Sequence, residues 1–405
     1  MKRQIKKNSI KEQTGTHDSF RFAQPFFTTL PPEKRPLIRG VGRRMTDYIA
    51  TKLLPIPDPQ RNPTMTLADI IGQQGTNEII TAGSIKFHAV GDTWNPNNIQ
   101  QMAVTNAMTK DYSISAPQHS PAFFLHLGDV NYYNNTDSGY HEQFYVPYKT
   151  YPGKIIAIPG NHDGELFKYD GTSTGQKTTL EAFMRNFCQP APGVPPAAGT
   201  IYREMPSQPG VYWHLDAPFV DIIGLYSNIA ENPGYIADNA IVGQKQKNWL
   251  QQALTTIQQQ RTKNARKALV IVTHHPPYSN GGHSGSAQML AGIDDACTKA
   301  GIMPDAVLAG HSHNYQRYTR TISFNKKSLQ IPFIVAGTGG RNADPVTKPS
   351  KKKTGGVSFD QSLSGYGYLL VTASPQFLSF NFYQVKTNTV LYDSVKVNLT
   401  TNKLV

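Results

Sequence analysis

Short apolar runs alternate with longer polar stretches from about residue 83 onward. Each run is bounded by turn residues, and runs of this length predict buried β-strands. Apolar positions that recur every three or four residues predict helices between the runs, at 98–108 and 245–259. The strands are expected at 85–90, 123–127, 154–158, 268–272 and 306–309. This alternation indicates an α/β fold whose strands mostly run in one direction.

The C-terminal part of the chain has a different pattern. Apolar segments follow one another there without a helical segment between them, which favours antiparallel pairing. These strands are expected at 333–335, 368–371, 378–382 and 391–397. A second sheet packed on the first gives the expected fold class, α/β with α+β-type layers: a β-sandwich of two mixed sheets flanked by helices. The segments 189–196 and 337–356 are rich in proline or in glycine and lysine, and are predicted to be long surface loops.

The N-terminal part is expected to be an extension. Residues 1–80 are predicted to form a basic, partly helical extension that precedes one domain over 81–405. A basic amphipathic helix is expected at 36–54 and a short helix at 67–71. We expect this extension to pack against the domain.

The composition is that of a globular protein. Of the 405 residues, 38% are hydrophobic and 17% are charged. No apolar run approaches the roughly 18 residues of a membrane-spanning helix, so no membrane span is expected. The basic N-terminus lacks the apolar stretch of a secretory signal, so a cytoplasmic location is expected by default, with export by another route left open. Cys188 and Cys297 lack a metal-binding spacing, and each is expected to be a small buried apolar residue.

The net charge of +13 is concentrated in the first 45 residues and around Lys348–Lys353. No basic helix with interleaved aromatic residues is present, so these segments are interpreted as solvated and no nucleic-acid partner is expected. A positive field would favour a substrate that carries phosphate. The sequence leaves the oligomeric state open.

Five short motifs stand where predicted strands end. In α/β sheets, ligands collect beyond the carboxyl ends of the strands. Carboxylate and amide oxygens together with imidazole nitrogens suit metal ions, and this many ligands suit a pair of ions. The motifs are Gly-Asp-Thr-Trp (91–94), Gly-Asp-Val-Asn-Tyr (128–132), Gly-Asn-His-Asp (160–163), Thr-His-His-Pro-Pro (273–277) and Gly-His-Ser-His (310–313). The candidate ligands in them are Asp92, Asp129, Asn161, His274, His311 and His313.

This set of motifs resembles the calcineurin-like metallophosphoesterase superfamily, and within it most closely the purple acid phosphatases. The resemblance spans roughly residues 83–385 and includes Gly-Tyr-Gly-Tyr-Leu at 365–369. It implies two metal ions: a first, commonly ferric iron, and a second that is divalent iron, zinc or manganese. By the resemblance, the first ion is held by Asp92, Tyr132 and His313, the second by Asn161, His274 and His311, and Asp129 bridges them.

Two aromatic residues distinguish branches of the superfamily. Most members have a metal-binding histidine at the position of Trp94, whose indole nitrogen is only a donor. The purple branch lacks that histidine and has a tyrosine three residues after the second aspartate, where Tyr132 stands. The branch usually has glycine at position 94, so the tryptophan is a departure that affects the expected pocket beside the first metal.

The resemblance also assigns residues around the metals. His274 aligns as the ligand and His275 as a residue behind it, while His283 falls where the purple branch has a substrate-contacting histidine; a solvated loop histidine is the alternative for His283. His162 is expected to bind phosphate and protonate the leaving group, with Asp163 orienting its imidazole.

Three residues outside the ligand set also have an expected place. Tyr315 and Arg317 follow the last motif and are candidates for the border of the pocket, where the arginine could bind a phosphate oxygen. His126, inside a predicted strand, is expected to be a core histidine.

The expected function is a binuclear metal-dependent hydrolase of phosphate monoesters, in which metal-bound hydroxide attacks phosphorus and His162 assists the leaving group. Its expected partner is a small phosphorylated substrate or a phosphopeptide. Phosphodiesterase, nucleotidase and phosphoprotein (tyrosine) phosphatase activities on the same scaffold are alternatives. Outside this class, the alternatives are a non-catalytic protein with structural metals and a polyanion-binding protein.

Overall fold

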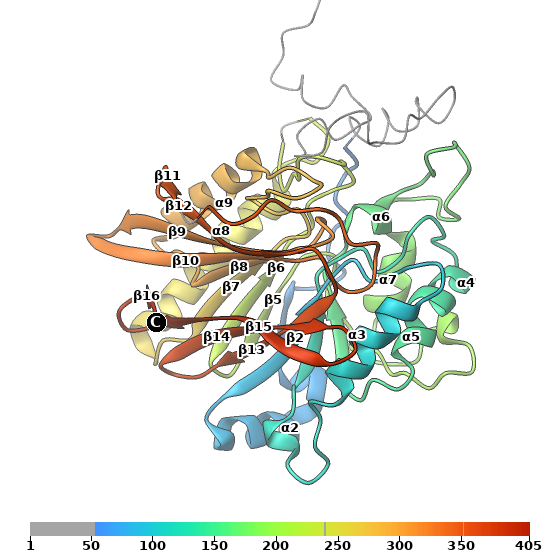
Figure 1. The fold of residues 1–405 in the computed structure, drawn as a ribbon, viewed down its shortest axis with the longest axis horizontal. Helices are drawn as coiled ribbons and strands as arrows, with labels where there is room; N and C mark the ends of the chain where they lie inside the picture. The colour runs from blue at the N-terminus through green and yellow to red at the C-terminus, as the bar shows by residue number, and fades with distance from the viewer. Residues whose placement is uncertain (1–52, 239, 351) are drawn as a thin grey trace, which may run out of the picture.

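Two β-sheets packed face to face form the centre of the computed structural model, and helices cover their outer faces (Figure 1). The structure describes residues 53–238, 240–350 and 352–405. The expected β-sandwich of two mixed sheets flanked by helices is confirmed. None of the helices in these three ranges is long and apolar enough to cross a membrane.

The larger sheet has nine strands in the order β1-β5-β6-β7-β8-β10-β9-β12-β11. Its central strands β6, β7, β8 and β10 run parallel to one another, and antiparallel strands complete both sides. The bounds are β1 Thr64–Thr66, β5 Trp213–Ala217, β6 Val220–Gly224, β7 Ala268–Val272, β8 Ala306–Ala309, β9 Tyr315–Phe324, β10 Lys327–Ala336, β11 Lys353–Thr354 and β12 Val357–Leu363.

The smaller sheet has seven strands in the order β16-β15-β14-β13-β2-β3-β4. The strands β2, β3 and β4 are parallel, and β13 pairs with β2 in the antiparallel sense. The bounds are β2 Ile85–Val90, β3 Phe123–His126, β4 Lys154–Ala157, β13 Gly367–Ala373, β14 Phe377–Val385, β15 Thr389–Asn398 and β16 Lys403–Leu404.

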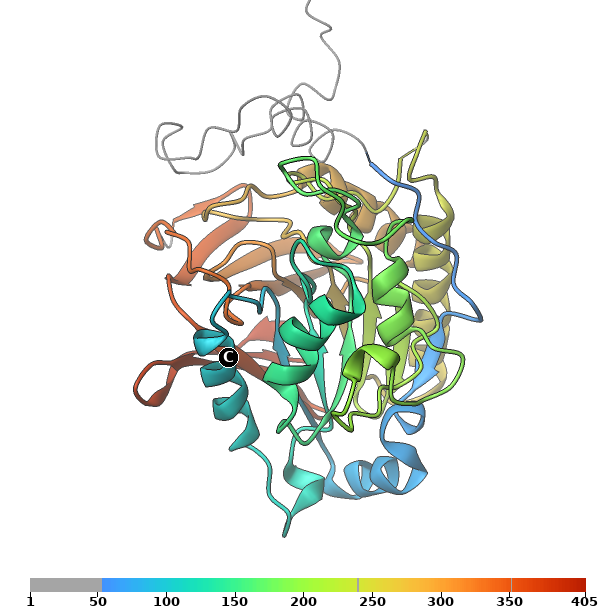
Figure 2. The ribbon, with the colours of Figure 1, turned by 90° about the vertical axis from the view of Figure 1, so that its right-hand side faces the viewer.

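Helices flank the sandwich on two sides, and Figure 2 faces the side on which α4 to α7 lie. The helices are α2 Ala68–Ala82, α3 Ile99–Thr109, α4 Asp137–Tyr140, α5 Val146–Tyr148, α6 Asn161–Gly164, α7 Glu181–Phe187, α8 Lys245–Lys263 and α9 Ala287–Ala300; short 3-10 turns cover η3 Pro117–His119 and η5 Pro196–Ala198, and a π-helical turn covers η4 His141–Tyr145.

Apolar side chains fill three layers. Between the sheets, residues of both meet in one buried cluster that includes Phe87, Val270 and Phe382. On the outer face of the larger sheet, α8 and α9 bury Leu254 and Ile293 against β6 and β7. A third cluster packs α3, α5 and α7 against the smaller sheet. The strands are thus held from both faces, which fixes the positions of their ends.

The strands predicted at 85–90, 268–272 and 306–309 are confirmed to the residue. The antiparallel pairing expected for 333–335 is found with β9. The expected place in a sheet with the later strands is wrong, because this segment belongs to β10, which lies in the larger sheet and also pairs in parallel with β8. The three later strands do pair in antiparallel order, but they extend the smaller sheet through β13. Cys188 and Cys297 are buried and unpaired as expected.

Part of the expected N-terminal extension is built into the larger sheet. β1 pairs in parallel with β5, and α2 follows it. The helix expected at 67–71 is longer in the structure, because α2 continues to Ala82 before Gly83 ends it in a left-handed conformation. The helix predicted at 36–54 lies outside the described residues apart from its last two positions. The division at residue 80 remains a prediction.

Candidate metal centre

The five motifs meet at the carboxyl ends of strands from both sheets. Asp92 follows β2, Asp129 follows β3 and Asn161 begins α6 after β4, while His274 and His311 follow β7 and β8. Asp92, Asp129 and His311 have positive φ angles of 58°, 54° and 68°. Such angles are uncommon for residues with a Cβ atom and occur often at functional sites. Each strand therefore ends in a sharp turn that directs a polar side chain to one place.

Two glycines allow the turns to approach one another. Gly128 has φ 95°, and a Cβ atom there would lie 2.5 Å from Nδ1 of His274. A Cβ atom at Gly160 would overlap the carboxylate of Asp129. Only glycine fits at these positions, because the backbone itself forms part of the wall around the ligands.

Asn161, His274 and His311 bring three acceptor atoms together. Oδ1 of Asn161 lies 3.1 Å from Nε2 of His274 and 3.0 Å from Nδ1 of His311. The other ring nitrogen of His274 donates to the carbonyl of Leu127 at 2.9 Å, and that of His311 donates to the carbonyl of Glu231 at 2.7 Å. In neutral imidazoles with these partners, the nitrogens that face Asn161 carry lone pairs. Three atoms whose lone pairs face one another repel, and a cation between them removes this repulsion.

A metal ion fits this arrangement. Atoms bound to one ion at about 2.0–2.2 Å lie roughly 3 Å apart, which matches the spacing around Asn161. The backbone carbonyls of Leu127 and Glu231 fix the ring orientations from behind, as outer partners of metal-binding histidines do. These three residues could hold one ion.

Asp92, Tyr132 and His313 lie beside this first group. The hydroxyl of Tyr132 donates to Oδ1 of Asp92 at 3.3 Å, and Nε2 of His313 lies 3.6 Å from the same oxygen. Burial raises the pKa of Tyr132 well above its ordinary value, and the carboxylates of Asp129 and Asp92 raise it further. A phenolate there would therefore need a strongly charged cation. These three residues could hold a second ion.

Asp129 lies between the two groups. Its Oδ1 atom is 3.4 Å from Nε2 of His274 and accepts the backbone N–H of His162 at 3.0 Å. Ligand atoms of Asp92, Asp129 and His274 all lie within 4.8 Å of one another. Burial raises the pKa of Asp92 to about 7, and the neighbouring Asp129 adds to the rise. Two buried carboxylates so close together are stabilised by positive charge, which an ion supplies.

His162 is paired with a carboxylate that the sequence analysis did not single out. Its Nδ1 atom lies 2.9 Å from Oε2 of Glu165, and Nε2 faces Asp129 at 4.0 Å. Burial lowers the pKa of His162, but Glu165 and Asp129 raise it more, to about 9. The histidine therefore keeps a proton at neutral pH.

The orienting role predicted for Asp163 needs correction. Its carboxylate accepts the backbone N–H groups of Gly160, Val130 and Asn131 at 2.7, 3.2 and 3.1 Å. Consecutive residues of a helical turn point in different directions, so Asp163 cannot face the ring of its neighbour, whereas Glu165 three residues on can. Asp163 instead joins the turns after β3 and β4.

His283 lies at the edge of the centre. Its ring centroid is 4.3 Å from that of His311 and 5.6 Å from that of His313. Asp344 lies near both, 3.5 Å from Nδ1 of His313 and 3.9 Å from Nε2 of His283. The structure thus brings His283 beside two of the candidate ligands, and its contact with substrate remains a prediction.

His275 lies behind the predicted ligands, and both of its ring nitrogens have other partners. Its Nδ1 atom accepts from the hydroxyl of Ser227 at 2.7 Å, and Nε2 donates to the carbonyl of Ala230 at 2.6 Å. Both ring nitrogens are used behind His311, whose ring centroid is 4.2 Å away. This placement agrees with a residue behind the ligands.

The pocket role considered for Arg317 is wrong. Two carboxylates hold its guanidinium: Asp393 contacts Nε at 2.6 Å and Asp360 contacts Nη1 at 3.3 Å. Tyr315 also donates to Asp393, at 2.7 Å. These charges are neutralised within the sheets.

The loop after β10 supplies an arginine that the sequence analysis missed. Residues 337–340 are buried, contrary to the surface loop predicted over 337–356. The guanidinium carbon of Arg341 lies 4.5 Å from the ring centroid of Tyr132 and 5.7 Å from that of Trp94. No local motif marks Arg341 or Asp344, because each meets its partners only through the folded chain. Glu165 lies three residues after His162, and this helical spacing is a local signal that could have indicated it.

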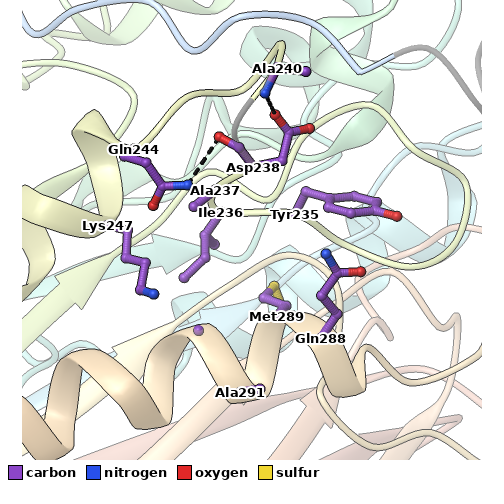
Figure 3. A pocket seen from close by; sticks show the side chains of 11 residues that line it. Tyr235, Ile236, Ala237, Asp238, Ala240, Gln244, Lys247, Gln288, Met289 and Ala291 are labelled. Carbon is purple, nitrogen blue, oxygen red and sulfur yellow. Dashed lines mark hydrogen bonds between the residues drawn. The ribbon is translucent and has the colours of Figure 1, made fainter. Parts of the chain in front are cut away.

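A separate cavity of about 560 Å³ lies between the segment 235–247 and α9. Figure 3 shows Tyr235 and Ile236 on one wall and Gln288 and Met289 on the other. None of the predicted site residues lines this cavity.

Comparison with known proteins agrees with the motifs. A 174-residue segment is 28% identical to probable purple acid phosphatase 20 of Arabidopsis thaliana; it covers 42% of this chain and 37% of that protein, so this chain matches little more than a third of its relative's length. The fold is similar to that of GAP50, the anchor in the inner membrane complex of Plasmodium, with a TM-score of 0.53 at 15% identity over 78% of this chain and 89% of that one. The structure of PhoD matches with a TM-score of 0.46 at 14% identity, over 86% of this chain and 72% of that one.

The family profile described as calcineurin-like phosphoesterase matches residues 85–315, which is more than half of the chain and includes all five motifs. The chain therefore belongs to the calcineurin-like phosphoesterase family.

Proposed function

We propose that the protein is a metal-dependent hydrolase of phosphate monoesters, similar in activity to acid phosphatases. The observation that carries this proposal is the convergence of lone pairs from Asn161, His274 and His311 beside the carboxylates of Asp92 and Asp129. The similarity to a purple acid phosphatase supports monoesters over other esters.

Two metal ions are proposed as cofactors, ferric iron with Asp92, Tyr132 and His313, and a divalent iron, zinc or manganese ion with the Asn161 group. Asp129 would contact both. When bound, such a pair activates water and neutralises charge on the phosphoryl group.

His162 is proposed as the proton donor to the leaving alcohol. Glu165 holds its Nδ1 side, which leaves the Nε2 proton on the side of Asp129 and the centre. The backbone N–H of His162 is tied to Asp129, so the ring and the ligand are positioned together. A positioned acid of this kind contributes roughly 10²- to 10⁴-fold to a rate.

Water is proposed to attack phosphorus directly. Burial raises the pKa of the Cys188 and Cys297 thiols to about 12, and neither belongs to the centre. No motif of the chain offers a serine or cysteine nucleophile, so a covalent phosphoenzyme is not expected, and one in-line displacement inverts the configuration at phosphorus.

Turnover of p-nitrophenyl phosphate by metal-loaded protein tests the activity. We expect it to exceed turnover of the bis ester, a nucleotide and a phosphotyrosine peptide. Turnover of an alkyl phosphate monoester, whose leaving alcohol must be protonated, should fall about 10²-fold or more in His162→Asn with metal content unchanged. His119→Asn, an exposed histidine, serves as the control. Faster turnover of the diester would replace the monoester assignment, and retention with a chiral phosphate would overturn direct attack.

A further inference from the structure

The loop after β10 is tied to the turn that carries Asp92. The N–H of Gly339 donates to the carbonyl of Gly91 at 3.0 Å, and the N–H of Arg341 donates to the carbonyl of Asp92 at 2.9 Å. The backbone of Arg341 is therefore fixed directly beside a candidate metal ligand.

Aromatic rings orient the side chain of Arg341. Its guanidinium carbon lies 4.5, 5.6 and 5.7 Å from the ring centroids of Tyr132, Tyr133 and Trp94, and Nη2 donates to the hydroxyl of Tyr133 at 3.4 Å. Stacking on ring faces stabilises a guanidinium and leaves its N–H groups free to point outward in its plane. Trp94, the departure in the first motif, thus provides part of the surface on which the arginine rests.

The charge of Arg341 is not neutralised by a carboxylate as the charges of Arg317 and Arg320 are. Arg320 is held by both oxygens of Asp294, at 2.8 and 2.6 Å. Within residues 53–405, positions 239 and 351 excepted, no carboxylate oxygen lies within 4.0 Å of a guanidinium nitrogen of Arg341. A partly exposed guanidinium without such a partner can accept an external anion as a two-point fork.

The same aromatic surface reaches the candidate centre. Tyr132, on which Arg341 stacks, donates to Asp92 and lies 4.5 Å from the ring of His162. Tyr133 lies 4.9 Å from the same histidine. The cation and the proposed proton donor thus contact the same two aromatic side chains.

We infer that Arg341 binds an oxygen of the substrate's phosphoryl group, as a substrate-binding residue supplied by the loop after β10. This inference rests on the proposed function, since it requires the phosphoryl group to be bound at the neighbouring centre. Arg341 would thus bind the phosphate oxygen that the sequence suggests for Arg317. The substrate class it favours is one whose phosphoryl group carries full negative charge, as monoesters do.

Binding of inorganic phosphate to metal-loaded protein, measured by isothermal titration calorimetry, tests the inference without turnover. We expect the Kd to rise at least about tenfold in Arg341→Gln, because the variant loses the charge-assisted hydrogen bonds to the anion. Arg341→Lys should fall between, since lysine keeps the charge but loses the fork. Lys352→Gln, which removes an exposed charge from the same loop, should leave the Kd within about twofold.

Metal content and thermal unfolding of each variant separate the outcomes. A Kd for phosphate within twofold of the unaltered protein in Arg341→Gln, with metal content intact, overturns the inference while leaving hydrolysis untouched. A second outcome also overturns the inference: Arg341→Gln loses metal, Arg341→Lys does not, and the Kd for phosphate per remaining site is normal. In that case the arginine only supports Tyr132. If the unaltered protein binds phosphate through Arg341 but hydrolyses no ester, the proposed function fails and the binding role stands.

Discussion

Oε2 of Glu165 lies 2.9 Å from Nδ1 of His162, and both side chains are buried. This pair fixes the imidazole in one orientation and holds positive charge on it. Asn161, His162 and Glu165 are thus a candidate ligand, the proposed proton donor and the carboxylate that positions it. All three lie within five consecutive residues.

Glu165→Gln is expected to lower kcat about 10- to 100-fold with little change in metal content, because the imidazole loses its charged partner. The protonated histidine is the active form, so activity is lost as pH rises through its pKa. Glu165 raises that pKa, so the loss should move to lower pH in the variant. The pH–rate profile measures this, and an unshifted profile would contradict the role of Glu165.

Asp163→Asn is the matched change and should behave differently. An amide replaces one acceptor oxygen with a donor facing backbone N–H groups, so we expect a loss of about 1–3 kcal/mol in the free energy of unfolding. Thermal or denaturant unfolding measures it. A shift of the pH–rate profile without loss of stability would restore the original prediction for Asp163.

His274→Asn and His275→Asn distinguish the two adjacent histidines. We expect the first to lower the metal content by about one ion per chain and the second to keep both ions but unfold at lower temperature, because Ser227 and Ala230 lose their partner. Elemental analysis of purified protein gives the stoichiometry. If His275→Asn loses metal and His274→Asn does not, His275 is the ligand and His274 the residue behind it.

Tyr132→Phe tests iron at the first position. A phenolate bound to ferric iron absorbs visible light, so iron-loaded protein should be coloured and the variant should lose the band. Tyr133→Phe, the neighbouring phenol, should keep it. Iron-free protein that is active and colourless would remove ferric iron from the proposal.

The histidine at position 126 should make stability fall in acid. Burial lowers its pKa to about 3, whereas the unfolded chain takes up the proton near 6.5. Between these values only the unfolded state is protonated, so the free energy of unfolding decreases as pH falls from 6.5, by up to about 1.4 kcal/mol per pH unit. Denaturant unfolding at several pH values should show a shallower slope in His126→Phe than in His119→Gln; equal slopes would exclude this histidine as the source.

Local sequence patterns were sufficient to predict the candidate ligands, but not the residues whose partners are distant along the chain. Asp92, Asp129, Asn161 and His311 stand directly after strands, so strand prediction placed them at one edge of a sheet. Arg341 could not be found in this way, because its partners are rings more than 200 residues away along the chain. Asp163 was chosen by adjacency to His162, although the geometry of a helical turn favours the residue three positions on.

The order of strands in the larger sheet was likewise predicted only in part. Alternating strands and helices predicted β7 and β8, but the position of β10 depends on the hairpin with β9, for which an isolated apolar run gives no signal. The hairpin β5–β6 was not predicted either, since its strands lie within a long stretch of mixed composition.

The three residues of β1 close one side of the larger sheet by pairing with β5. A protein shortened to begin at the predicted boundary would leave Trp213–Ala217 with a free row of backbone N–H and C=O groups and would uncover the apolar surface now shielded by Met65 and Leu67. An exposed edge strand of this kind can pair with a strand of another molecule. Self-association and precipitation of the trimmed protein are therefore the expected cost of removing a segment that contains no candidate ligand.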